Sequence, residues 1–238
     1  MKLSIVIPVY NEEKLIGETI KKVVSVVLPG RIEKEIVIVD DGSRDKTVEK
    51  IKSAMRTQKQ DITFIAKKTN EGKGAALRDA FAKTTGDIVL IQDADLEYSP
   101  DDYALLLEPF LKGGADVVYG SRFISDRPHR VLYFWHSVMN KFLTMFSNMF
   151  SNLNLTDMET GFKVFKGDLI RTIAPRLVSH RFGFEPEITA RIAKVPGVKI
   201  CEVGISYAGR TYTEGKKIGW VDGVRAVCAI IYFNLFSS

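Results

Sequence analysis

Short, uninterrupted runs of aliphatic residues recur through the first half of the chain, and each is followed by a polar or glycine-containing segment. Such runs are typical of strands that are buried on both faces of a parallel sheet. They predict strands at residues 3–7, 35–39, 62–66, 88–91 and 116–119. Pro8 is expected to end the first of these strands, because proline has no N–H to donate within a central strand.

Amphipathic segments lie between these runs and predict helices. The expected helices cover residues 13–27, 46–56 and 72–84, and another begins at Ser99, which supplies its cap. Strands alternate with helices, so the sequence predicts an α/β fold with a mostly parallel sheet and right-handed crossovers. Beyond Arg122 the pattern is less regular. Helices are expected at 131–151, 166–174, 185–194 and from 219, strands at 162–165 and 198–207, and a loop at 156–161.

The composition is that of a globular protein with enough apolar residues for a substantial core. The 238 residues are 45% apolar and 26% charged, and the net charge of +5 favours anionic partners such as phosphates or a membrane surface. No basic block with interleaved aromatic residues indicates nucleic acid. Cys201 and Cys228 lack the spacing of a disulfide framework or a zinc site, so we expect both to be buried and reduced in a cytoplasmic protein. We expect no signal peptide, and no apolar stretch reaches the ~20 residues of a membrane span.

Paired acids follow the aliphatic run at 88–91. Asp93 and Asp95 come directly after it, and Glu97 follows two residues later. Ser99 already supplies the cap of the next helix, so neither aspartate is needed for capping. Two carboxylates this close repel one another unless a cation lies between them, and oxygen ligands favour Mg2+ or Mn2+ completed by phosphates of a substrate. The segment therefore predicts a metal–diphosphate site, with Glu97 as a further ligand, direct or through water.

Acids and an aromatic residue also follow the first two predicted strands. Asp40 and Asp41 come after the run at 35–39, and because residues 43–45 can cap the next helix, we expect both aspartates to be free to bind a nucleobase or ribose. Tyr10 and Glu12 follow the first strand on the same rim of the sheet, where Tyr10 is suited to stacking on a base and Glu12 to binding a ribose hydroxyl.

A third candidate segment, Asn70-Glu71-Gly72-Lys73-Gly74, follows the third strand and opens a helix. Backbone N–H groups and Lys73 are suited to facing a phosphate there. A plain glycine turn is the other interpretation. The segment is neither a P-loop nor a dinucleotide fingerprint.

Four segments occur together in the order and spacing of one known family. They are residues 8–12, 40–43, 70–74 and 93–95, with the sequences PVYNE, DDGS, NEGKG and DAD. In these segments the chain resembles the inverting family 2 glycosyltransferases, which have the Rossmann-like GT-A fold. Further matches look like the branch of dolichol-phosphate mannose synthases and polyprenyl-phosphate glycosyltransferases; they are Arg122 after Gly-Ser, Asp157 with Gly161-Phe162-Lys163, and Arg210 with Gly215-Lys216. The resemblance covers nearly the whole chain.

The resemblance implies roles for the matched residues. The nucleotide sugar would be held by Pro8, Tyr10, Glu12, Val39, Asp40, Asp41, Lys73, Asp93, Ala94 and Lys216. The metal would be held by Asp93, Asp95 and Glu97, and the acceptor by Arg122, His136, Asn140 and Glu159. The catalytic set would be Asp95, Arg122, Asp157 and Arg210. The chain departs from these synthases at two positions. The synthases carry a glutamine where this chain has Glu97, and an arginine near the position of His136.

No linker-like composition divides the chain, which predicts a single domain, and the resemblance implies a reaction. We expect one domain, 1–238, with a nucleotide-sugar half at 1–125, an acceptor half at 126–210 and an amphipathic segment at 211–238. A hexose would pass from a donor such as GDP-mannose or UDP-glucose to a dolichyl or polyprenyl phosphate. Such a phosphate needs no general base, because its second pKa is ~6. A saccharide or other hydroxyl acceptor would need one, with Asp157 or Glu159 as candidates. A nucleotidyltransferase and a non-catalytic sugar-nucleotide-binding module stay open as alternatives.

Two segments, 131–151 and 220–236, carry more apolar residues than one narrow helical stripe. They are either core helices or an oligomer interface, or they are interfacial helices that meet a lipid carrier on the cytoplasmic face of a membrane. A membrane-protein partner for the same helices is also open.

Overall fold

The computed structural model describes residues 1–58, 60–125, 131, 133–181, 183–209 and 220–237. Its strands are β1 (Lys2–Val9), β2 (Glu33–Asp40), β3 (Ile62–Ala66), β4 (Ile88–Ile91), β5 (Val117–Ser121), β6 (Lys163–Lys166) and β7 (Ile200–Gly204). Its helices are α1 (Ile16–Ser25), α2 (Thr47–Thr57), α3 (Lys73–Phe81), α4 (Tyr103–Lys112), α5 (Phe134–Ser151), α6 (Gly167–Ile173), α7 (Phe184–Ala193) and α8 (Trp220–Leu235), with short 3-10 turns at Pro100–Asp102 and Ala174–Arg176. Each predicted strand and helix has a counterpart here, offset by a few residues at its ends.

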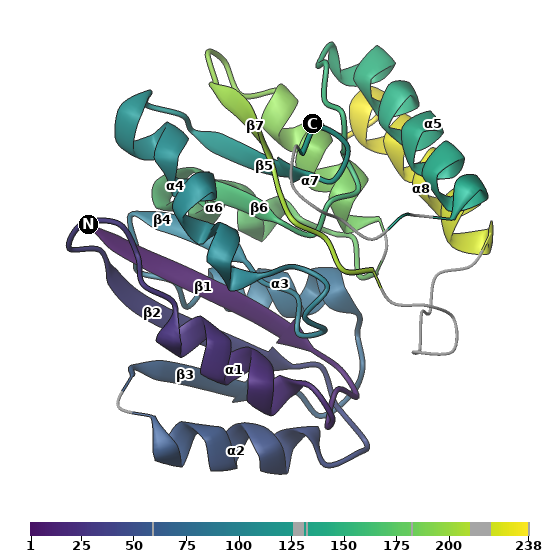
Figure 1. Cartoon of the computed structure of the whole chain (residues 1–238). Coiled ribbons are helices and arrows are strands. Elements are labelled where there is room, and N and C mark those ends of the chain that lie inside the picture. Colours follow the sequence, from purple (N-terminus) through teal and green to yellow (C-terminus); the bar gives the residue numbers. More distant parts are fainter. Residues whose placement is uncertain (59, 126–130, 132, 182, 210–219, 238) are drawn as a thin grey trace.

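The strands form one sheet in the order β3-β2-β1-β4-β6-β5-β7 (Figure 1). Strand β6 is antiparallel to both of its neighbours, and the other pairings are parallel. The expected α/β class with a mostly parallel sheet flanked by helices is therefore confirmed. The chain runs outward from β1 to β3 and then returns to place β4 on the other side of β1. This reversal makes a topological switch point between β1 and β4, where open α/β sheets bind ligands at the carboxyl ends of their strands.

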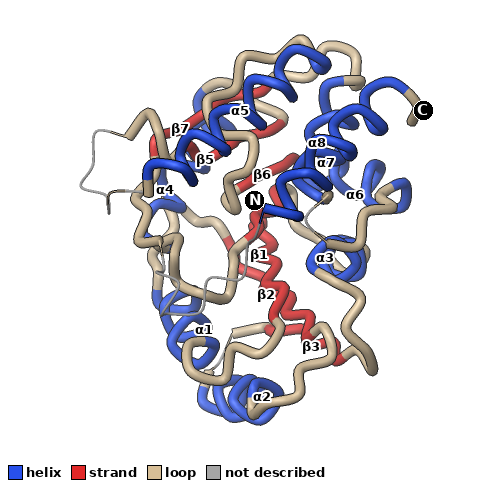
Figure 2. Tube along the Cα trace, turned by 90° about the vertical axis from the view of Figure 1, so that its right-hand side faces the viewer, coloured by secondary structure: helices blue, strands red, loops and turns tan. Residues whose placement is uncertain are grey.

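The sheet is buried on both faces. In β4, Ile88 and Leu90 pack with α1 and α4, whereas Val89 and Ile91 pack with α3, α6 and α7. Figure 2 shows the sheet near its edge, with α1 and α4 on one side and α3 and α6 on the other. Both faces of the strand need apolar side chains, and this is why the aliphatic runs in the sequence are continuous. Each of the two cores takes residues from early and late parts of the chain.

Pro8 does not end the first strand as expected. It lies within β1 and is paired with Val39 of β2. The backbone carbonyl of Val6 accepts a hydrogen bond from the backbone N–H of Gln92 and therefore points toward the β4 side. The backbone groups of Pro8, two residues later, point to the same side. The pairing of β1 with β4 stops at Ile91, so no acceptor there requires an N–H from residue 8. Proline is tolerated because its neighbouring strand is shorter.

The expectation of two buried cysteines is wrong. Cys201 is partly exposed and Cys228 is exposed, because β7 is an edge strand and Cys228 lies on the outer side of α8. Helix α8 packs beside α5 and α7 (Figure 1). Within the described part of the chain, no helix is long and apolar enough to cross a membrane.

Candidate active site

The loops that follow β1 and β2 are joined by a set of short hydrogen bonds. The backbone N–H of Asn11 donates to Ser43 Oγ at 2.9 Å, and Arg44 N–H returns a bond to Asn11 Oδ1 at 2.9 Å. Asn11 adopts a positive φ of 53°, which turns the chain sharply at the end of β1. The N-cap residue of α2 is Lys46 rather than Ser43 or Asp45, but Asp45 Oδ1 accepts from the N–H of Thr47 at 3.0 Å in the first turn of this helix. The rim of the sheet is thereby held in one arrangement.

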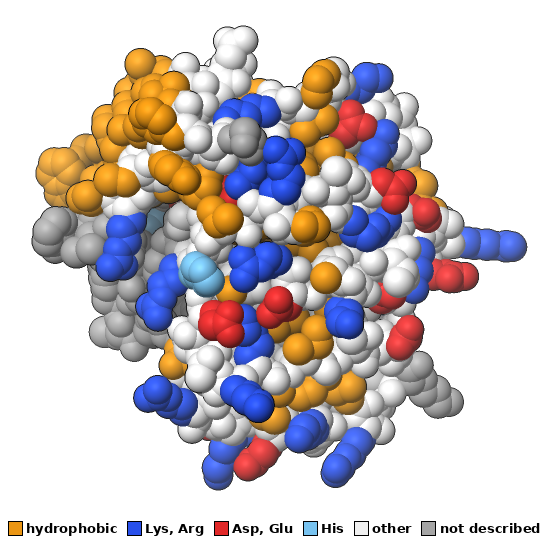
Figure 3. All heavy atoms as spheres, turned by 180° about the vertical axis from the view of Figure 1, so that it is seen from behind, with side chains coloured by type: hydrophobic (Ala, Val, Ile, Leu, Met, Phe, Trp, Pro, Cys, Tyr) orange, Lys and Arg blue, Asp and Glu red, His pale blue; other side chains and the backbone are white. Residues whose placement is uncertain are grey.

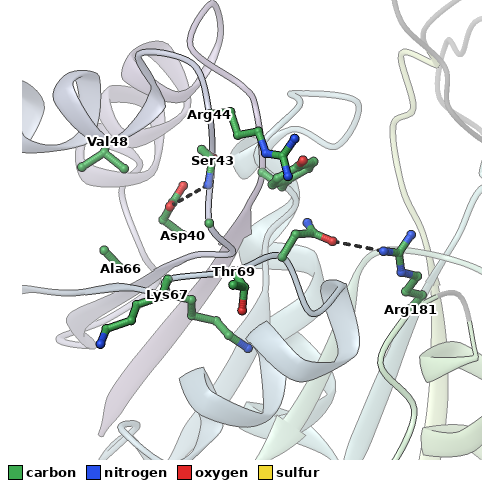
Figure 4. A pocket seen from close by; sticks show the side chains of 12 residues that line it. Asp40, Ser43, Arg44, Val48, Ala66, Lys67, Thr69 and Arg181 are labelled. Carbon is green, nitrogen blue, oxygen red and sulfur yellow. Dashed lines mark hydrogen bonds between the residues drawn. The ribbon is translucent and has the colours of Figure 1, made fainter.

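A cavity of about 530 Å³ opens at this rim (Figure 4). Its wall is formed by Tyr10, Asp40, Gly42, Ser43, Arg44, Val48, Ala66, Lys67, Lys68, Thr69, Asn70 and Arg181. Asp40 accepts from the N–H of Ser43 at 3.0 Å through one carboxylate oxygen. Its other oxygen, Oδ1, is buried and has no hydrogen-bond partner among the described residues. An unmatched buried acceptor is uncommon in proteins and suits a ligand that brings an N–H group.

Asp41 is not free as expected. It is buried, and its carboxylate accepts from the N–H groups of Glu71 at 3.0 Å and Gly72 at 2.6 Å. These bonds fasten the 70–72 loop to the end of β2. Gly42 completes the junction, since a Cβ at this residue (φ 73°) would lie 2.7 Å from the backbone carbon of Thr69. Asp41 therefore shapes the wall of the cavity through the backbone, and a direct contact with a nucleoside stays a prediction.

The loop after β4 is anchored before it reaches its acids. The Gln92 amide donates to Asp93 O at 2.9 Å and to Tyr98 O at 3.3 Å, and it accepts from the hydroxyl of Tyr103 at 2.7 Å. Leu96 has a positive φ of 59°, which turns the loop back on itself. The cap predicted at Ser99 is confirmed, because its side chain accepts from the N–H of Asp101. Asp93 and Asp95 thus sit on a loop whose shape other residues maintain.

Lys73 lies against Asp93. Its Nζ is 2.9 Å from Asp93 Oδ1 and 3.1 Å from Glu185 Oε1 at the start of α7. Burial opposes the charge of this lysine, but the carboxylates of Asp93 and Glu185 outweigh that effect and raise its pKa. The same Asp93 is packed tightly on its other side, since a Cβ at Gly161 would lie 2.3 Å from Asp93 Oδ2.

These residues fit a hard divalent cation only in part. Asp93 already holds a positive group at hydrogen-bond distance, and Asp95 follows on the same loop, so the oxygen donors suit Mg2+ or Mn2+. One oxygen of Glu97, Oε2, accepts from the hydroxyl of Tyr207 at 2.7 Å, and a metal-binding role for Glu97 stays a prediction. Among the described residues no group of three or more Asp, Glu, His or Cys side chains is arranged to hold a metal. A cation here would need oxygens from a bound diphosphate to complete its coordination.

Arg122, at the end of β5, is paired with Asp157. The guanidinium donates to both carboxylate oxygens at 2.7 Å, and the backbone N–H of Arg122 adds a third bond at 3.0 Å. Burial disfavours the charged arginine, but Asp157 outweighs it and raises the Arg122 pKa. Glu202 on β7 holds the turn behind this pair by accepting from the N–H of Thr156 at 2.8 Å. The ring of Tyr207 lies 5.2 Å from the guanidinium and links it to Glu97.

The half-buried Glu159 and the buried Lys163 form a second charged group beside this pair. Burial raises the pKa of Glu159 and lowers that of Lys163. Glu159 Oε1 is buried without a hydrogen-bond partner in the described residues, whereas Lys163 donates to Thr160 O and lies over the ring of Tyr119. The charges here are only partly compensated.

Seven further predicted residues fall into three groups. His136 and Asn140 lie one turn apart on α5, with Asn140 Nδ2 3.3 Å from His136 Nδ1. Pro8 and Val39 are buried in their strands and Ala94 is buried in its loop, so these residues would contact a ligand through their backbone. Arg210 and Lys216 lie outside the described residues.

Sequence reasoning missed Glu185, Glu202 and Tyr207. An acid in the first turn of a helix is explained by the helix dipole, so Glu185 carried no further signal. Glu202 and Tyr207 belong to an alternating strand pattern that gives no hint of a site. In the sequence, Lys163 stands out only as part of the Gly161-Phe162-Lys163 motif. The one usable signal for these residues is expected burial. A charged residue within a helix or strand that packs on a core usually has a partner, so its presence there indicates a second charged or polar group nearby.

Comparisons with known proteins show the family and support the fold. Residues 4–173 match the model of the family described as glycosyl transferase family 2. This chain belongs to glycosyl transferase family 2. The expected GT-A-like fold is supported by solved structures, among them glucosyl-3-phosphoglycerate synthase from Mycobacterium tuberculosis in complex with Mn2+, uridine diphosphate and phosphoglyceric acid. It superposes with a TM-score of 0.70 at 18% identity and covers 98% of this chain and 78% of that one.

Two family 2 relatives carry names that match the expected branch. A dolichol-phosphate mannosyltransferase of Pyrococcus furiosus is 27% identical over 92% of this chain. A dolichyl-phosphate beta-glucosyltransferase of Trichomonas vaginalis is 31% identical over 86% of this chain. The chain spans 61% and 65% of the length of these two relatives.

Proposed function

We propose that this family 2 member transfers a hexose, with inversion, from a nucleoside diphosphate sugar to a polyprenyl or dolichyl phosphate. The proposal rests on two features at the carboxyl ends of neighbouring strands, the cavity that Asp40 lines after β2 and the Lys73–Asp93 pair after β4, beside the switch point of the sheet. The cavity beside Asp40 has the size and the unmatched acceptor that a nucleoside needs. The relatives named above act on polyprenyl-type phosphates, which favours this acceptor over others.

The proposed reaction is a single displacement. An oxygen of the acceptor phosphate forms a bond to the anomeric carbon, and the bond from that carbon to the donor diphosphate breaks, so the nucleoside diphosphate leaves with the electron pair. A divalent cation held by Asp93 and Asp95 would supply positive charge at this leaving group. Lys73 adds a second positive group on the same side. No proton has to be removed from the acceptor, because a phosphate is largely ionised at neutral pH.

The state of Asp157 favours a phosphate acceptor. A general base for a hydroxyl acceptor has to reach the proton that it removes. Asp157 is fully buried and both of its oxygens are bound to Arg122. This pair suits a positioning role for Arg122, which faces Tyr207 and the acceptor half. Glu159, with its raised pKa and its unmatched oxygen, is the remaining base candidate, so a hydroxyl acceptor such as a phosphoglycerate is the alternative to test.

We further propose that α5 and α8 dock on a membrane surface that carries the acceptor. Large apolar side chains are exposed along both helices; they are Phe134, Trp135, Val138, Met139, Phe142, Met145, Met149, Val224, Tyr232 and Leu235. Figure 3 views the molecule from behind, and apolar atoms gather at its upper left, in the region where these helices lie. Trp135 is 78% exposed, which is costly in water and favourable at a lipid interface. The cytoplasmic face and a homo-oligomer or membrane-protein partner stay predictions.

Product analysis tests the reaction. The protein is incubated with Mn2+ and either GDP-mannose or UDP-glucose, and with either a short polyprenyl phosphate or 3-phosphoglycerate. We expect hexosyl polyprenyl phosphate and free nucleoside diphosphate from one of the donors. Transfer only to 3-phosphoglycerate would replace the proposed acceptor, and release of inorganic diphosphate would indicate a nucleotidyltransferase instead.

Vesicle binding tests the membrane surface. Trp135→Ser should reduce co-sedimentation with vesicles of phosphatidylcholine and phosphatidylserine several-fold, since an indole contributes strongly at the interface. Val27→Ser is the matched control, because Val27 is 87% exposed but lies at the end of α1, away from both helices. Equal binding of the wild type and both variants would contradict the docking surface.

A further inference from the structure

Lys73 lies beside the Asp93 carboxylate, in the place where a metal cation bound to that carboxylate would otherwise lie. Its ammonium group bridges two acids from different parts of the fold, Asp93 after β4 and Glu185 at the start of α7. The lysine and the two acids are largely buried, with side-chain exposures of 28%, 18% and 8%. Asp93 is therefore neutralised by the protein itself before any metal binds.

The backbone that carries Lys73 is fixed. Gly72 precedes the helix with a φ of 100°, and a Cβ there would lie 2.1 Å from the carbonyl oxygen of His180. The N–H of Gly74 donates to that same carbonyl oxygen at 2.9 Å, and a Cβ on Gly74 would lie 2.2 Å from Ser179 O. The amino end of α3 is thus locked against the segment that leads into α7. Only the flexible side chain of Lys73 can move between its two acids.

Two cations cannot share Asp93 without repulsion. A divalent ion that binds the Asp93 carboxylate has to approach the Lys73 ammonium closely, and the partly buried surroundings screen the two charges weakly. The repulsion falls if the Lys73 ammonium moves away from Asp93, toward Glu185 and the anionic oxygens of a bound diphosphate. Glu185 keeps the buried ammonium paired throughout this movement, and an unpaired buried charge would be costly.

We propose that Lys73 is an internal placeholder cation for Asp93, and that Glu185 is the positioning residue which receives it when metal and nucleoside diphosphate bind together. The inference rests on the proposed metal–diphosphate site. Its consequence is coupling: the metal alone binds weakly because Lys73 competes for Asp93, and the diphosphate strengthens metal binding because it attracts Lys73 away from that carboxylate.

Direct Mn2+ binding tests this exchange without any acceptor. The loss of the free-ion signal in electron paramagnetic resonance gives the dissociation constant for Mn2+ with and without uridine or guanosine diphosphate. Lys73→Met removes the competing ammonium and should tighten binding of Mn2+ alone about tenfold, which corresponds to about 1.4 kcal/mol. Glu185→Gln removes the second anchor, leaves Lys73 on Asp93 and should weaken Mn2+ binding in the presence of nucleotide several-fold.

Two further variants keep the test decisive. Lys166→Met breaks a more exposed lysine–aspartate pair, in which Lys166 Nζ lies 2.6 Å from Asp116 Oδ1 at the other end of the sheet, and should leave Mn2+ affinity unchanged. The double variant Lys73→Met/Glu185→Gln removes the ammonium without leaving Glu185 charged and unpaired, and it should bind Mn2+ alone at least as tightly as Lys73→Met. Mn2+ binding that is unchanged or weaker in both Lys73 variants would overturn the placeholder role.

The outcome is separable from the fate of the proposed reaction. If polyprenyl phosphate is not glycosylated but Lys73→Met still tightens Mn2+ binding, the placeholder stands and only the acceptor assignment fails. If neither the wild type nor any variant binds Mn2+, with or without nucleotide, both the metal site and the placeholder are wrong.

Discussion

Two clusters of buried charge lie at opposite ends of the sheet. At the amino end of β2, the Glu35 carboxylate accepts from the Ser4 hydroxyl, from the N–H of Thr85 at 2.9 Å, and from Lys2 Nζ at 2.9 Å. At the carboxyl end, Lys73 is divided between two acids, and Asp40 Oδ1 and Glu159 Oε1 have no partner in the described part of the chain. The first cluster is saturated by its own fold, and the second is not.

This difference separates architecture from function. Burial by itself raises the Glu35 pKa, but the bonds from Ser4, Thr85 and Lys2 outweigh burial and lower that pKa to about 2. Burial and the nearby Glu185 carboxylate raise the pKa of Glu159, and the positive charges of Lys163 and Arg122 offset this only in part. Buried polar groups that are fully paired stiffen a structure, whereas incompletely paired ones indicate where a ligand completes the network. Glu35 should therefore matter for stability, and the carboxyl-end cluster for binding and turnover.

The largest expected effect is on turnover. Asp93→Asn removes a charge that the metal and Lys73 share, so the transfer rate should fall about 10²–10³-fold, equivalent to several kcal/mol of lost charge stabilisation. The free energy of unfolding should change little, because an amide still accepts from Lys73. Steady-state kinetics and urea unfolding measure the two quantities. A variant that unfolds readily but turns over normally would reverse the assigned roles of the two ends.

The matching change at the amino end is Glu35→Gln. Here the free energy of unfolding should fall by about 2–3 kcal/mol, since an amide cannot accept from all of Ser4, Thr85 and Lys2. Donor affinity and turnover should stay at wild-type values in conditions where the variant is folded. Chemical denaturation measures the first quantity. Loss of donor binding in the folded variant would mean that the two ends are not independent.

The pH dependence of stability tests the stabilising role of Glu35. The folded pKa of Glu35, about 2, lies below its ordinary value of 4.5, so its contribution is fully present above pH 4.5 and is lost as pH falls toward 2. Between pH 6 and pH 3 the wild type should lose about 2 kcal/mol more than Glu35→Gln, as two-state linkage requires. Urea unfolding of both proteins across this range measures the difference, and parallel profiles would contradict it.

The smallest effect has the opposite sign. A carboxyl whose folded pKa is raised contributes stability below its ordinary pKa of 4.5 and loses that stability as pH rises through the folded pKa. Glu159 should therefore oppose folding at pH 8, and Glu159→Gln should leave the free energy of unfolding unchanged or increase it by up to ~1 kcal/mol. Denaturation at pH 8 and pH 5 checks this; a clear loss of stability at pH 8 would show that Glu159 is well paired.

The strands were predictable because β1, β2 and β4 are buried on both faces, which forces continuous aliphatic runs. The place of β6 was not, because its antiparallel insertion between β4 and β5 depends on contacts far apart in the chain. The prediction that Pro8 ends the first strand was wrong for a related reason. Pro8 is compatible with β1 only because the neighbouring strand β4 is shorter, which the local sequence does not reveal.

The site was predictable where residues follow the ends of strands that meet at one edge, as Asp40 and Asp93 do. It was not where a side chain serves a distant backbone. Asp41 was expected to be free because the N–H groups of Glu71 and Gly72, about thirty residues later, cannot be anticipated from local sequence. Glu185 escaped notice because nothing near it in the sequence indicates Lys73.

We expect the carboxyl end of the sheet, where buried charges lack partners, to bind a metal ion together with a nucleoside diphosphate. A crystal structure with Mn2+ and uridine or guanosine diphosphate, with the ion located by its anomalous scattering, tests it most directly. We expect an ion coordinated by carboxylate oxygens of Asp93 and Asp95, a base in the cavity beside Asp40, and Lys73 moved toward Glu185 and the phosphates. A nucleotide bound away from that cavity, or an ion that leaves the Asp93–Lys73 pair intact, would contradict it.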